Sequence, residues 1–331
     1  MTDRLVDGVA GLVCDLDGVV YAGPRAVPGA IDGLRAAGLP CVYATNNAAR
    51  TPADVAAHLR ELGLELADED VITSSVAAAH WLAERLPAGA AVLAVGGPGV
   101  TDALRAAGLD ARSPGDGAQC VAVLQGYGPD VRARDLAEAA HAVQGGATWV
   151  ATNTDLTLPT DRGPAPGNGS LVAAVAQAVD VSPEVIGKPH PPMYLLAADH
   201  LGVAPGRVLA VGDRLETDVA GAVAAGTPAA LVLTGVHGLP DAAAAPASDR
   251  PTYVIADLGG LVEPYPPARH EDGWHVRGGA RARVVAGRLD RSGEGLDVER
   301  AALDALWAAT DAGQLTPDAA RVAMGESAAG G

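Results

Sequence analysis

The stretch VCDLDGVV, residues 13 to 20, places two aspartates, Asp15 and Asp17, at the end of an apolar run. A buried strand normally closes on uncharged residues, so the two carboxylates require an explanation. Taken alone, the D-x-D-G pattern is weak evidence, because many surface turns contain Asp and Gly. In an open α/β sheet, however, ligands bind in the crevice outside the carboxyl ends of the strands. The stretch therefore predicts a functional site, provided that the rest of the chain forms such a sheet.

The rest of the chain alternates short apolar runs with helical patterns, which is typical of a parallel sheet covered by helices. Strands are predicted over residues 9–14 and 41–45, and for the later runs AAVLAVGG, CVAVLQG, ATWVATN, GRVLAVGD and PAALVLTGV. The helical pattern TPADVAAHLRELGL begins with Thr51 as its N-cap, Pro52 at its first position and Asp54 three residues after the cap. At 331 residues the chain is longer than one compact core needs, so we expect more than one domain.

Two segments interrupt this alternation. The stretch PTDRGPAPGNGS, residues 159–170, predicts a long loop, and long loops in compact proteins are often functional. From residue 264 the chain becomes rich in Pro and polar residues, followed by two short strand-like pieces and one amphipathic helix, VERAALDALWAATDAG. We interpret residues 264–331 as a small α+β appendage with a solvated two-stranded face, which carries the arginines Arg277, Arg281, Arg283, Arg288 and Arg291.

Composition and charge narrow the class of protein. Hydrophobic residues make up 49% and charged residues 19% of the chain, which is a globular composition, and the net charge of −17 argues against nucleic acid or anionic membrane as a partner. The N-terminus shows no signal-peptide pattern, and no apolar window approaches the length of a membrane span. Three widely spaced cysteines favour reduced thiols. We therefore expect a cytoplasmic protein.

Polar residues follow the ends of other predicted strands as well. Thr45, Asn46 and Asn47 follow the strand at residues 41–45, and Asp213 follows VLAVG, with Asp218 five residues later. Taken one at a time, these are explained by a turn and by an Asp-capped helix start. Together they favour a site, because three carboxylates at the ends of sheet strands repel one another unless a divalent cation lies among them. Hard oxygen ligands of this kind suit Mg²⁺.

Lys188 lies between these motifs, in VIGKPHPPM, where prolines at positions 189, 191 and 192 constrain the chain. A lone lysine is usually a solvated charge, but this one follows an apolar piece and precedes three prolines. Its ammonium group, the hydroxyl of Thr45 and the amides that follow Thr45 can hold phosphate oxygens beside the metal. The combined pattern favours a phosphorylated small molecule as the ligand.

The order of the motifs DLDGVVYAG, ATNNAARTP, GKPHPPMY and GDRLETDVAGAVAAG, followed by LVLTGV, resembles the haloacid dehalogenase superfamily. Within it, the chain is similar to the branch of NagD-like, p-nitrophenyl phosphate and phosphoglycolate phosphatases, over residues 9–262. It also resembles actinobacterial glycerol-3-phosphate phosphatases, which carry a C-terminal extension. The resemblance implies an α/β fold: a Rossmann-like parallel sheet core with an inserted α/β cap domain and the small C-terminal appendage.

The resemblance also implies a role for each motif residue. Asp15 matches the nucleophile that forms an aspartyl-phosphate, and Asp17 matches the general acid and base. The Asp15 carboxylate, the Asp17 backbone carbonyl and the Asp213 carboxylate would hold Mg²⁺, with Asp218 orienting a metal-bound water. Thr45, Asn46, Asn47 and Lys188 would bind the phosphoryl group, and Gly18 would let the backbone turn beneath it.

In this branch a cap inserted between the second and third motifs closes the site and selects the leaving group. The predicted division is 1–78 and 186–263 for the core, 79–185 for the cap and 264–331 for the appendage. Asn153 and Asp155 in ATNTDLTLP are the cap candidates. Leu158 stands where some relatives have a substrate-contacting His, so their preferences do not carry over. The resemblance also allows a homodimer formed through the cap.

The expected function is a Mg²⁺-dependent phosphatase acting on small phosphorylated metabolites, with glycerol 3-phosphate or phosphoglycolate as the first choices. The alternatives are a phosphomutase, a sugar or nucleotide monophosphatase on the same core, and a non-enzymatic metabolite-binding regulatory module. A dehalogenase does not need an acid at position 17, which favours phosphoryl transfer. The motifs leave the substrate open, because all of these esters carry the same phosphate group.

Overall fold

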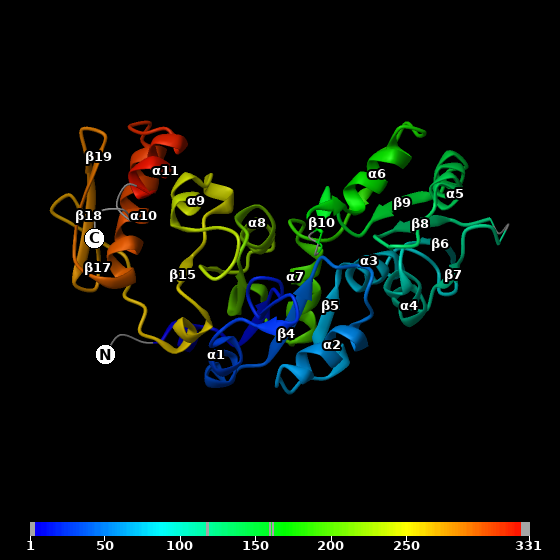
Figure 1. Ribbon diagram of the computed structural model, residues 1–331, viewed down its shortest axis with the longest axis horizontal. Coiled ribbons are helices and arrows are strands. Elements are labelled where there is room, and N and C mark those ends of the chain that lie inside the picture. The colour runs from blue at the N-terminus through cyan, green and yellow to red at the C-terminus, as the bar shows by residue number, and fades with distance from the viewer. Residues whose placement is uncertain (1–3, 117–118, 159, 161, 326–331) are drawn as a thin grey trace. The chain divides into compact units, whose positions relative to one another are not determined.

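The computed structural model describes residues 4–116, 119–158, 160 and 162–325. The chain divides into two compact units: unit 1 contains residues 1–41 and 201–331, and unit 2 contains residues 42–200. Both units are built on parallel sheets with helices, so the predicted α/β class is confirmed (Figure 1). Within the described residues, no helix has the length and apolar character that crossing a membrane requires.

The sheet of unit 1 is parallel, with the strand order β15-β14-β13-β1. Every residue of β1, β13 and β14 is buried, as expected of parallel strands that are covered on both faces. The bounds of the four strands are Gly11–Cys14 (β1), Val208–Gly212 (β13), Ala229–Val232 (β14) and Tyr253–Ile255 (β15). The same part of the unit contains the hairpin strands β2 (Tyr21–Ala22) and β3 (Arg25–Ala26) and the helices α1 (Ala30–Ala37), α8 (Ala220–Ala224) and α9 (Leu239–Ala244).

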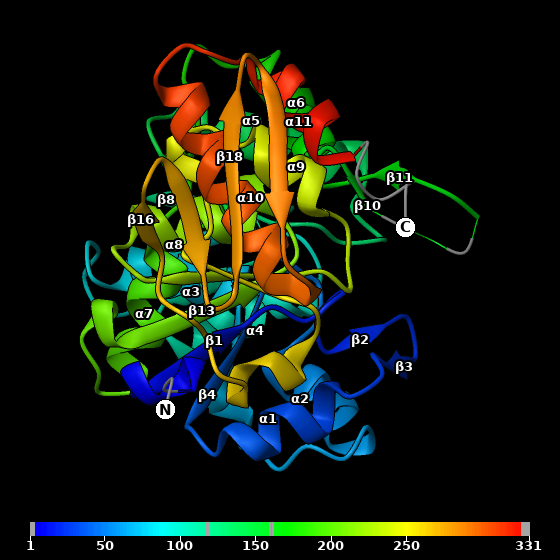
Figure 2. The same cartoon turned by 90° about the vertical axis from the view of Figure 1, so that its left-hand side faces the viewer.

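The appendage is larger in secondary structure than the sequence pattern indicated. Instead of two strands and one helix it has an antiparallel four-stranded sheet and two helices. The sheet lies against α10, in front of that helix in Figure 2. Its elements are β16 (Arg269–Glu271), β17 (Trp274–Arg277), β18 (Ala280–Val285), β19 (Arg288–Ser292), α10 (Gly295–Asp311) and α11 (Pro317–Gly325).

The appendage arginines are not uniformly solvated either. Arg277 and Asp304 form a bidentate pair with N···O distances of 2.7 and 3.0 Å, and their side chains are only 11% and 14% exposed. Burial alone would lower the pKa of Arg277, but its hydrogen bonds to Asp304 raise that pKa overall. On the other face of the sheet, Arg281 and Arg283 lie over the Trp274 ring. The prediction of a solvated two-stranded face was therefore wrong for Arg277, and also for Arg291, whose side chain is only 18% exposed and pairs with Glu299.

We expect Asp304→Ala to destabilise the protein by about 1–3 kcal/mol, because it leaves the largely buried Arg277 guanidinium without its carboxylate. The melting temperature measures the effect. The matched control is Asp290→Ala, which removes the exposed partner of Arg283 in the same sheet, a change of about 1 kcal/mol or less. Equal shifts for the two variants would contradict the buried-pair interpretation.

The first strands of unit 2 are β4 (Cys41–Thr45), whose residues from Val42 onward belong to the unit, and β5 (Val71–Thr73), which pairs with it in parallel. The helices α2 (Pro52–Glu61), α3 (Ser74–Ala83) and α7 (Pro192–His200) accompany this pair. The predicted start of α2 is confirmed. The Thr51 hydroxyl accepts from Asp54 N–H at 3.1 Å, and the Asp54 carboxylate accepts from Thr51 N–H. The predicted boundary between residues 78 and 79 falls inside α3, which gave no clear pattern in the sequence.

The larger sheet of unit 2 is parallel, with the order β12-β9-β8-β6-β7, and Figure 1 shows α5 and α6 on one side of it and α4 on the other. Val95, Val123 and Trp149 pack with α5 and α6 residues in one buried cluster. The bounds are β6 (Ala91–Val95), β7 (Asp110–Arg112), β8 (Ala122–Gln125), β9 (Thr148–Ala151) and β12 (Glu184–Val185), with α4 (Pro98–Ala106), α5 (Ala133–Gln144) and α6 (Asn168–Ala176). The predicted loop at 159–170 is partly outside the described residues and contains β11 (Ala165–Pro166), which pairs with β10 (Thr157–Leu158). Its last three residues already belong to α6, so the predicted loop was too long at that end.

Candidate active site

Two of the predicted acids follow neighbouring strand ends in unit 1. Strands β1 and β13 pair in parallel with Cys14 opposite Val211, which brings Asp15 and Asp213 out at the same edge of the sheet. The backbone N–H of Asp15 donates to the Val211 carbonyl at 2.8 Å, so the sheet ladder extends to the acid itself. Asp213 is buried and Asp15 half-buried. The register of the sheet therefore fixes the backbone positions from which both carboxylates project.

Asp218 reaches the same region through a π-helical turn, Leu215–Val219. Arg214 N–H donates to Asp218 Oδ2 at 3.1 Å, which folds the turn back on itself. A side chain at Gly212 would collide with Asp218, so the glycine permits the close approach. Single π turns are frequent at functional sites, and this one buries an acid that the sequence placed five residues from Asp213.

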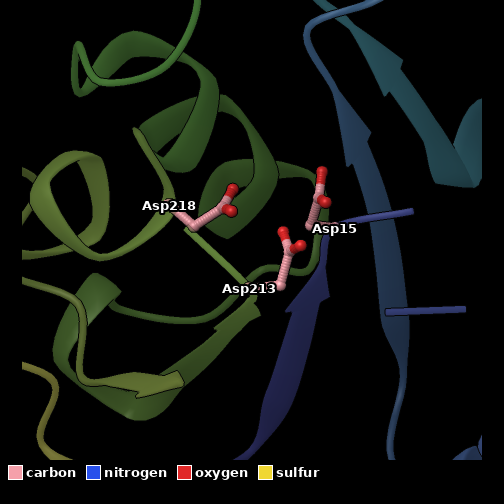
Figure 3. Close-up of side chains that lie close together, drawn as sticks. All are labelled: Asp15, Asp213 and Asp218. Atoms are coloured by element: carbon pink, nitrogen blue, oxygen red, sulfur yellow. The ribbon is translucent and has the colours of Figure 1, made fainter. Parts of the chain in front are cut away.

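The structure brings Asp15, Asp213 and Asp218 together. One carboxylate oxygen from each lies within 4.8 Å of the others, and Figure 3 shows the three side chains pointing toward a common space. Three hard oxygen donors, two of them from buried residues, fit Mg²⁺. Gly18 adds to the fit, because its φ is +83° and a Cβ there would lie 2.5 Å from Asp213 Oδ2. Asp17 is exposed and does not belong to this group of three.

In unit 2, Thr45 ends β4 as a buried residue. Its hydroxyl oxygen accepts from Asn47 N–H at 3.1 Å, and Asn47 Oδ1 in turn accepts from Ala49 N–H at 3.0 Å. Asn47 is exposed. The simpler interpretation of Asn47 as a turn residue thus accounts for its side-chain oxygen, while Thr45 closes the strand as the sequence predicted.

The side chain of Asn46 holds the backbone of Lys188, which lies 142 residues away in the chain. Asn46 Oδ1 accepts from Lys188 N–H at 2.9 Å, and Asn46 Nδ2 donates to the Lys188 carbonyl at 3.0 Å. The lysine itself is only 4% exposed, which excludes the simple interpretation as a solvated charge. Asn46 therefore positions the backbone of Lys188, a role that sequence reasoning missed because it depends on a contact distant in sequence.

The two cap candidates also meet at Asn46. Asn153 Nδ2 donates to the Asn46 carbonyl at 2.8 Å, and Asp155 Oδ2 accepts from Asn46 Nδ2 at 3.3 Å. Buried Asn168 supports them by donating from Nδ2 to the Asn153 carbonyl at 2.7 Å. The sequence pattern had indicated the loop PGNGS but not Asn168 itself. Leu158 lies in β10 and is half-buried.

Comparison with known proteins places these features in a family. A family model described as haloacid dehalogenase-like hydrolase matches residues 12–110, and a second, HAD-hydrolase-like model matches residues 185–261. The chain is 42% identical over 315 residues to D-glycerol 3-phosphate phosphatase of Mycobacterium tuberculosis, covering 90% of this chain and 86% of that protein. It is 37% identical over 247 residues to acid sugar phosphatase of Staphylococcus aureus, covering 74% of this chain and 93% of that protein.

Solved structures agree. The crystal structure of a glycerol phosphate phosphatase from Mycobacterium tuberculosis in complex with magnesium is similar with a TM-score of 0.84 and 39% identity, covering 93% of each chain. The p-nitrophenyl phosphatase from Archaeoglobus fulgidus is similar with a TM-score of 0.70 and 28% identity, covering 77% of this chain and 98% of that one. The chain belongs to the haloacid dehalogenase-like hydrolases. Within them it is a phosphoric monoester hydrolase of the NagD-like and p-nitrophenyl phosphatase branch.

Proposed function

We propose that this protein is a cytoplasmic, Mg²⁺-dependent phosphatase whose substrate is glycerol 3-phosphate. The observation that carries the phosphatase chemistry is the convergence of Asp15, Asp213 and Asp218 at one sheet edge. The choice of substrate is supported by the extent of sequence similarity, which includes 90% of this chain for a D-glycerol 3-phosphate phosphatase and 74% for the acid sugar phosphatases. A match of that extent must include most of the appendage.

The proposed reaction begins with attack of an Asp15 carboxylate oxygen on phosphorus, which breaks the bond to the alcohol oxygen and forms an aspartyl-phosphate. Asp17 donates a proton to the departing alkoxide, and then takes one from the water that hydrolyses the intermediate. Water attack releases inorganic phosphate and restores the Asp15 carboxylate. The exposed position of Asp17 allows this proton exchange with solvent.

Mg²⁺ would be held by the Asp15 carboxylate, the Asp17 backbone carbonyl and the Asp213 carboxylate, with Asp218 orienting a bound water, and it would neutralise negative charge on the phosphoryl oxygens. Thr45, the backbone amides after it and Lys188 are proposed to bind those oxygens. Since the side-chain groups of Asn46 already hold Lys188, we assign Asn46 a phosphate contact only through its backbone. Asn47 is likewise proposed to contact the phosphoryl oxygens through its backbone.

We further propose that residues 79–185 act as the cap over a core formed by 1–78 and 186–263, with 264–331 as the appendage. In this scheme Asn153 and Asp155 lie on the cap side and bond to Asn46. The cap then contributes to the choice of leaving group, and its outer surface is the place for a homodimer.

Phosphate release from a panel of esters tests the proposal. With Mg²⁺, we expect kcat/KM to be highest for glycerol 3-phosphate, followed by phosphoglycolate, sugar phosphates and nucleotide monophosphates. Removal of divalent ions with EDTA should abolish turnover, and added Mg²⁺ should restore it. As a control for contaminating phosphatases, the Asp15→Asn protein is purified in parallel and assayed in the same way.

The other outcomes separate the alternatives. A sugar phosphate at the top of the ranking would overturn glycerol 3-phosphate while keeping the phosphatase. An isomerised sugar phosphate without net phosphate release would indicate a phosphomutase. No turnover of any ester, together with measurable ligand binding, would favour a non-enzymatic regulatory module.

A further inference from the structure

The loop that follows β14, residues 234–237, has no role in the proposed reaction, although its first three residues belong to the motif LVLTGV, residues 231–236, which contributes to the family resemblance. In the structure this loop contacts both acid-bearing segments of unit 1. It bonds to the turn after Asp15 on one side and to the segment from Asp213 to Asp218 on the other. The contacts are specific enough to assign a function to two side chains.

The backbone of the loop orients Asp213. Val236 N–H donates to Asp213 Oδ2 at 2.8 Å, and His237 N–H donates to the Asp213 carbonyl at 3.1 Å. Gly235 lies so close that a side chain there would collide with the Asp213 carboxylate. Because one carboxylate oxygen accepts a backbone hydrogen bond, the rotation of the whole carboxylate is fixed relative to the loop.

Thr234 connects the loop to the turn that follows the two catalytic aspartates. Its hydroxyl donates to the Gly18 carbonyl at 2.8 Å. A Cβ at Gly18 would lie 3.1 Å from Asp213 Cγ and 3.2 Å from Gly235 Cα, so this turn lies directly against Asp213 and the loop. The Thr234 bond therefore sets how closely the Asp15 turn approaches Asp213.

His237 connects the loop to the turn that carries Asp218. Its Nδ1 accepts from Leu215 N–H at 3.0 Å, and Leu215 is the first residue of the π-helical turn. Nδ1 also lies 3.2 Å from Glu216 Oε2, but one ring nitrogen cannot accept from Leu215 and donate to Glu216 at once. Glu216 is 56% exposed and can be hydrated, whereas the backbone N–H has no such freedom, so we assign Nδ1 as the acceptor.

We propose that Thr234 and His237 are positioning residues whose side-chain hydrogen bonds set the spacing of Asp15, Asp213 and Asp218 for one Mg²⁺. The inference rests on the proposed function in its choice of metal, but it concerns residues that touch neither substrate nor metal. Partners that orient metal ligands typically change metal affinity about 10- to 100-fold when they are removed. A loop that merely packs would change stability and leave metal affinity alone.

The test is titration calorimetry of Mg²⁺ into protein stripped of divalent ions, without substrate, combined with the melting temperature of the metal-free protein. Thr234→Val removes the hydroxyl at constant shape, and Thr234→Ser restores it. His237→Leu removes the acceptor, and His237→Asn returns an acceptor oxygen near the position of Nδ1. We expect the Val and Leu variants to bind Mg²⁺ at least about tenfold more weakly, and the Ser and Asn variants to recover most of that loss.

Two controls match these changes. Thr252→Val removes a hydroxyl that accepts from Ala229 N–H at the opposite end of β14, and it should leave Mg²⁺ affinity unchanged whatever it does to stability. Glu216→Gln should also leave the Mg²⁺ affinity unchanged, because His237 Nδ1 accepts its hydrogen bond from Leu215 N–H and not from Glu216.

Several results would overturn the inference. Unchanged Mg²⁺ affinity in the Val and Leu variants would make the loop purely structural, and failure of the Ser and Asn variants to recover would exclude these hydrogen bonds as the cause. Absence of Mg²⁺ binding by the wild type would overturn it as well. If the affinities follow the expected pattern while no phosphate ester is turned over, the inference stands and the proposed function fails.

Discussion

Asp15→Asn is expected to lower kcat by at least about a thousandfold, because an amide cannot replace the carboxylate that attacks phosphorus. The substitution keeps the shape of the side chain at the end of β1, where the sheet ladder holds the backbone of residue 15. We therefore expect the variant to fold normally. Single-turnover phosphate release from the best ester of the panel, with circular dichroism as a check on folding, measures the effect.

A matched pair of variants completes this experiment. Asp32→Asn alters an exposed acid of α1 in the same unit and should keep wild-type activity. Asp17→Asn should slow both steps for an alkyl ester, because Asp17 also protonates the departing alkoxide. With p-nitrophenyl phosphate, whose leaving group needs no proton, only hydrolysis of the intermediate should be slow, so mass spectrometry of that variant after mixing with this ester should detect a phosphoryl group on Asp15. Residual turnover of Asp15→Asn above about a tenth of wild type would require another nucleophile.

The parts of the fold that the sequence predicted best are those in which local and tertiary signals agree. The apolar runs at residues 41–45 and 208–212 are strands because all or nearly all of their residues are buried between covering layers. Since parallel strands end at one edge, the polar residues after each run could be assigned to a site from their sequence positions alone. The capping box at Thr51 was predictable for a similar reason, as its signal lies within four residues.

Short elements were not predicted because they contain too few residues to show a periodic pattern of apolar side chains. Strand β12 has two residues and β7 has three, too few to show alternation. In the appendage, β16 reads RHE and is exposed throughout, and β18 carries arginines on one face and small residues on the other. Burial against α10, rather than a run of apolar residues, stabilises β17, β18 and β19, and β16 joins the sheet through its pairing with β17, so the sequence pattern indicates two strands where the structure has four.

Within the candidate site, the sequence predicted which residues matter better than it predicted what each one does. Asn46 was predicted to bind phosphate, but its side chain is occupied by Lys188 and Asp155, at separations of 142 and 109 residues. The hydrogen bond between Leu215 N–H and His237 Nδ1 likewise depends on how the loop after β14 folds over the π-helical turn. Hydrogen-bond partners of this kind are properties of the tertiary structure, and residue type alone does not specify them.

Lys188→Met is expected to lower kcat/KM about 10²- to 10³-fold, the range found when one group that stabilises charge in a transition state is removed. Methionine retains much of the length and apolar character of the lysine stem, so packing around this nearly buried side chain should be preserved. The measurement is kcat and KM for the best ester, together with the melting temperature. Lys188→Arg is the charge-preserving comparison and should recover only part of the loss, because a planar guanidinium does not match the shape of an ammonium group.

Asn46→Leu provides the comparison that links the lysine to its support. Leucine has a similar size but offers neither the acceptor for Lys188 N–H nor the donor for its carbonyl, so the backbone that carries the cation loses both bonds. If Lys188 acts on the phosphoryl group from a fixed position, Asn46→Leu should lower kcat/KM about tenfold and add little once Lys188 is already methionine. Independent, additive losses in the double variant would mean that Asn46 acts on substrate by another route. If kcat/KM of Lys188→Met lies within about threefold of the wild-type value, the lysine has no part in the mechanism. Removal of a buried cation that stabilises the transferring phosphoryl group would have a much larger effect.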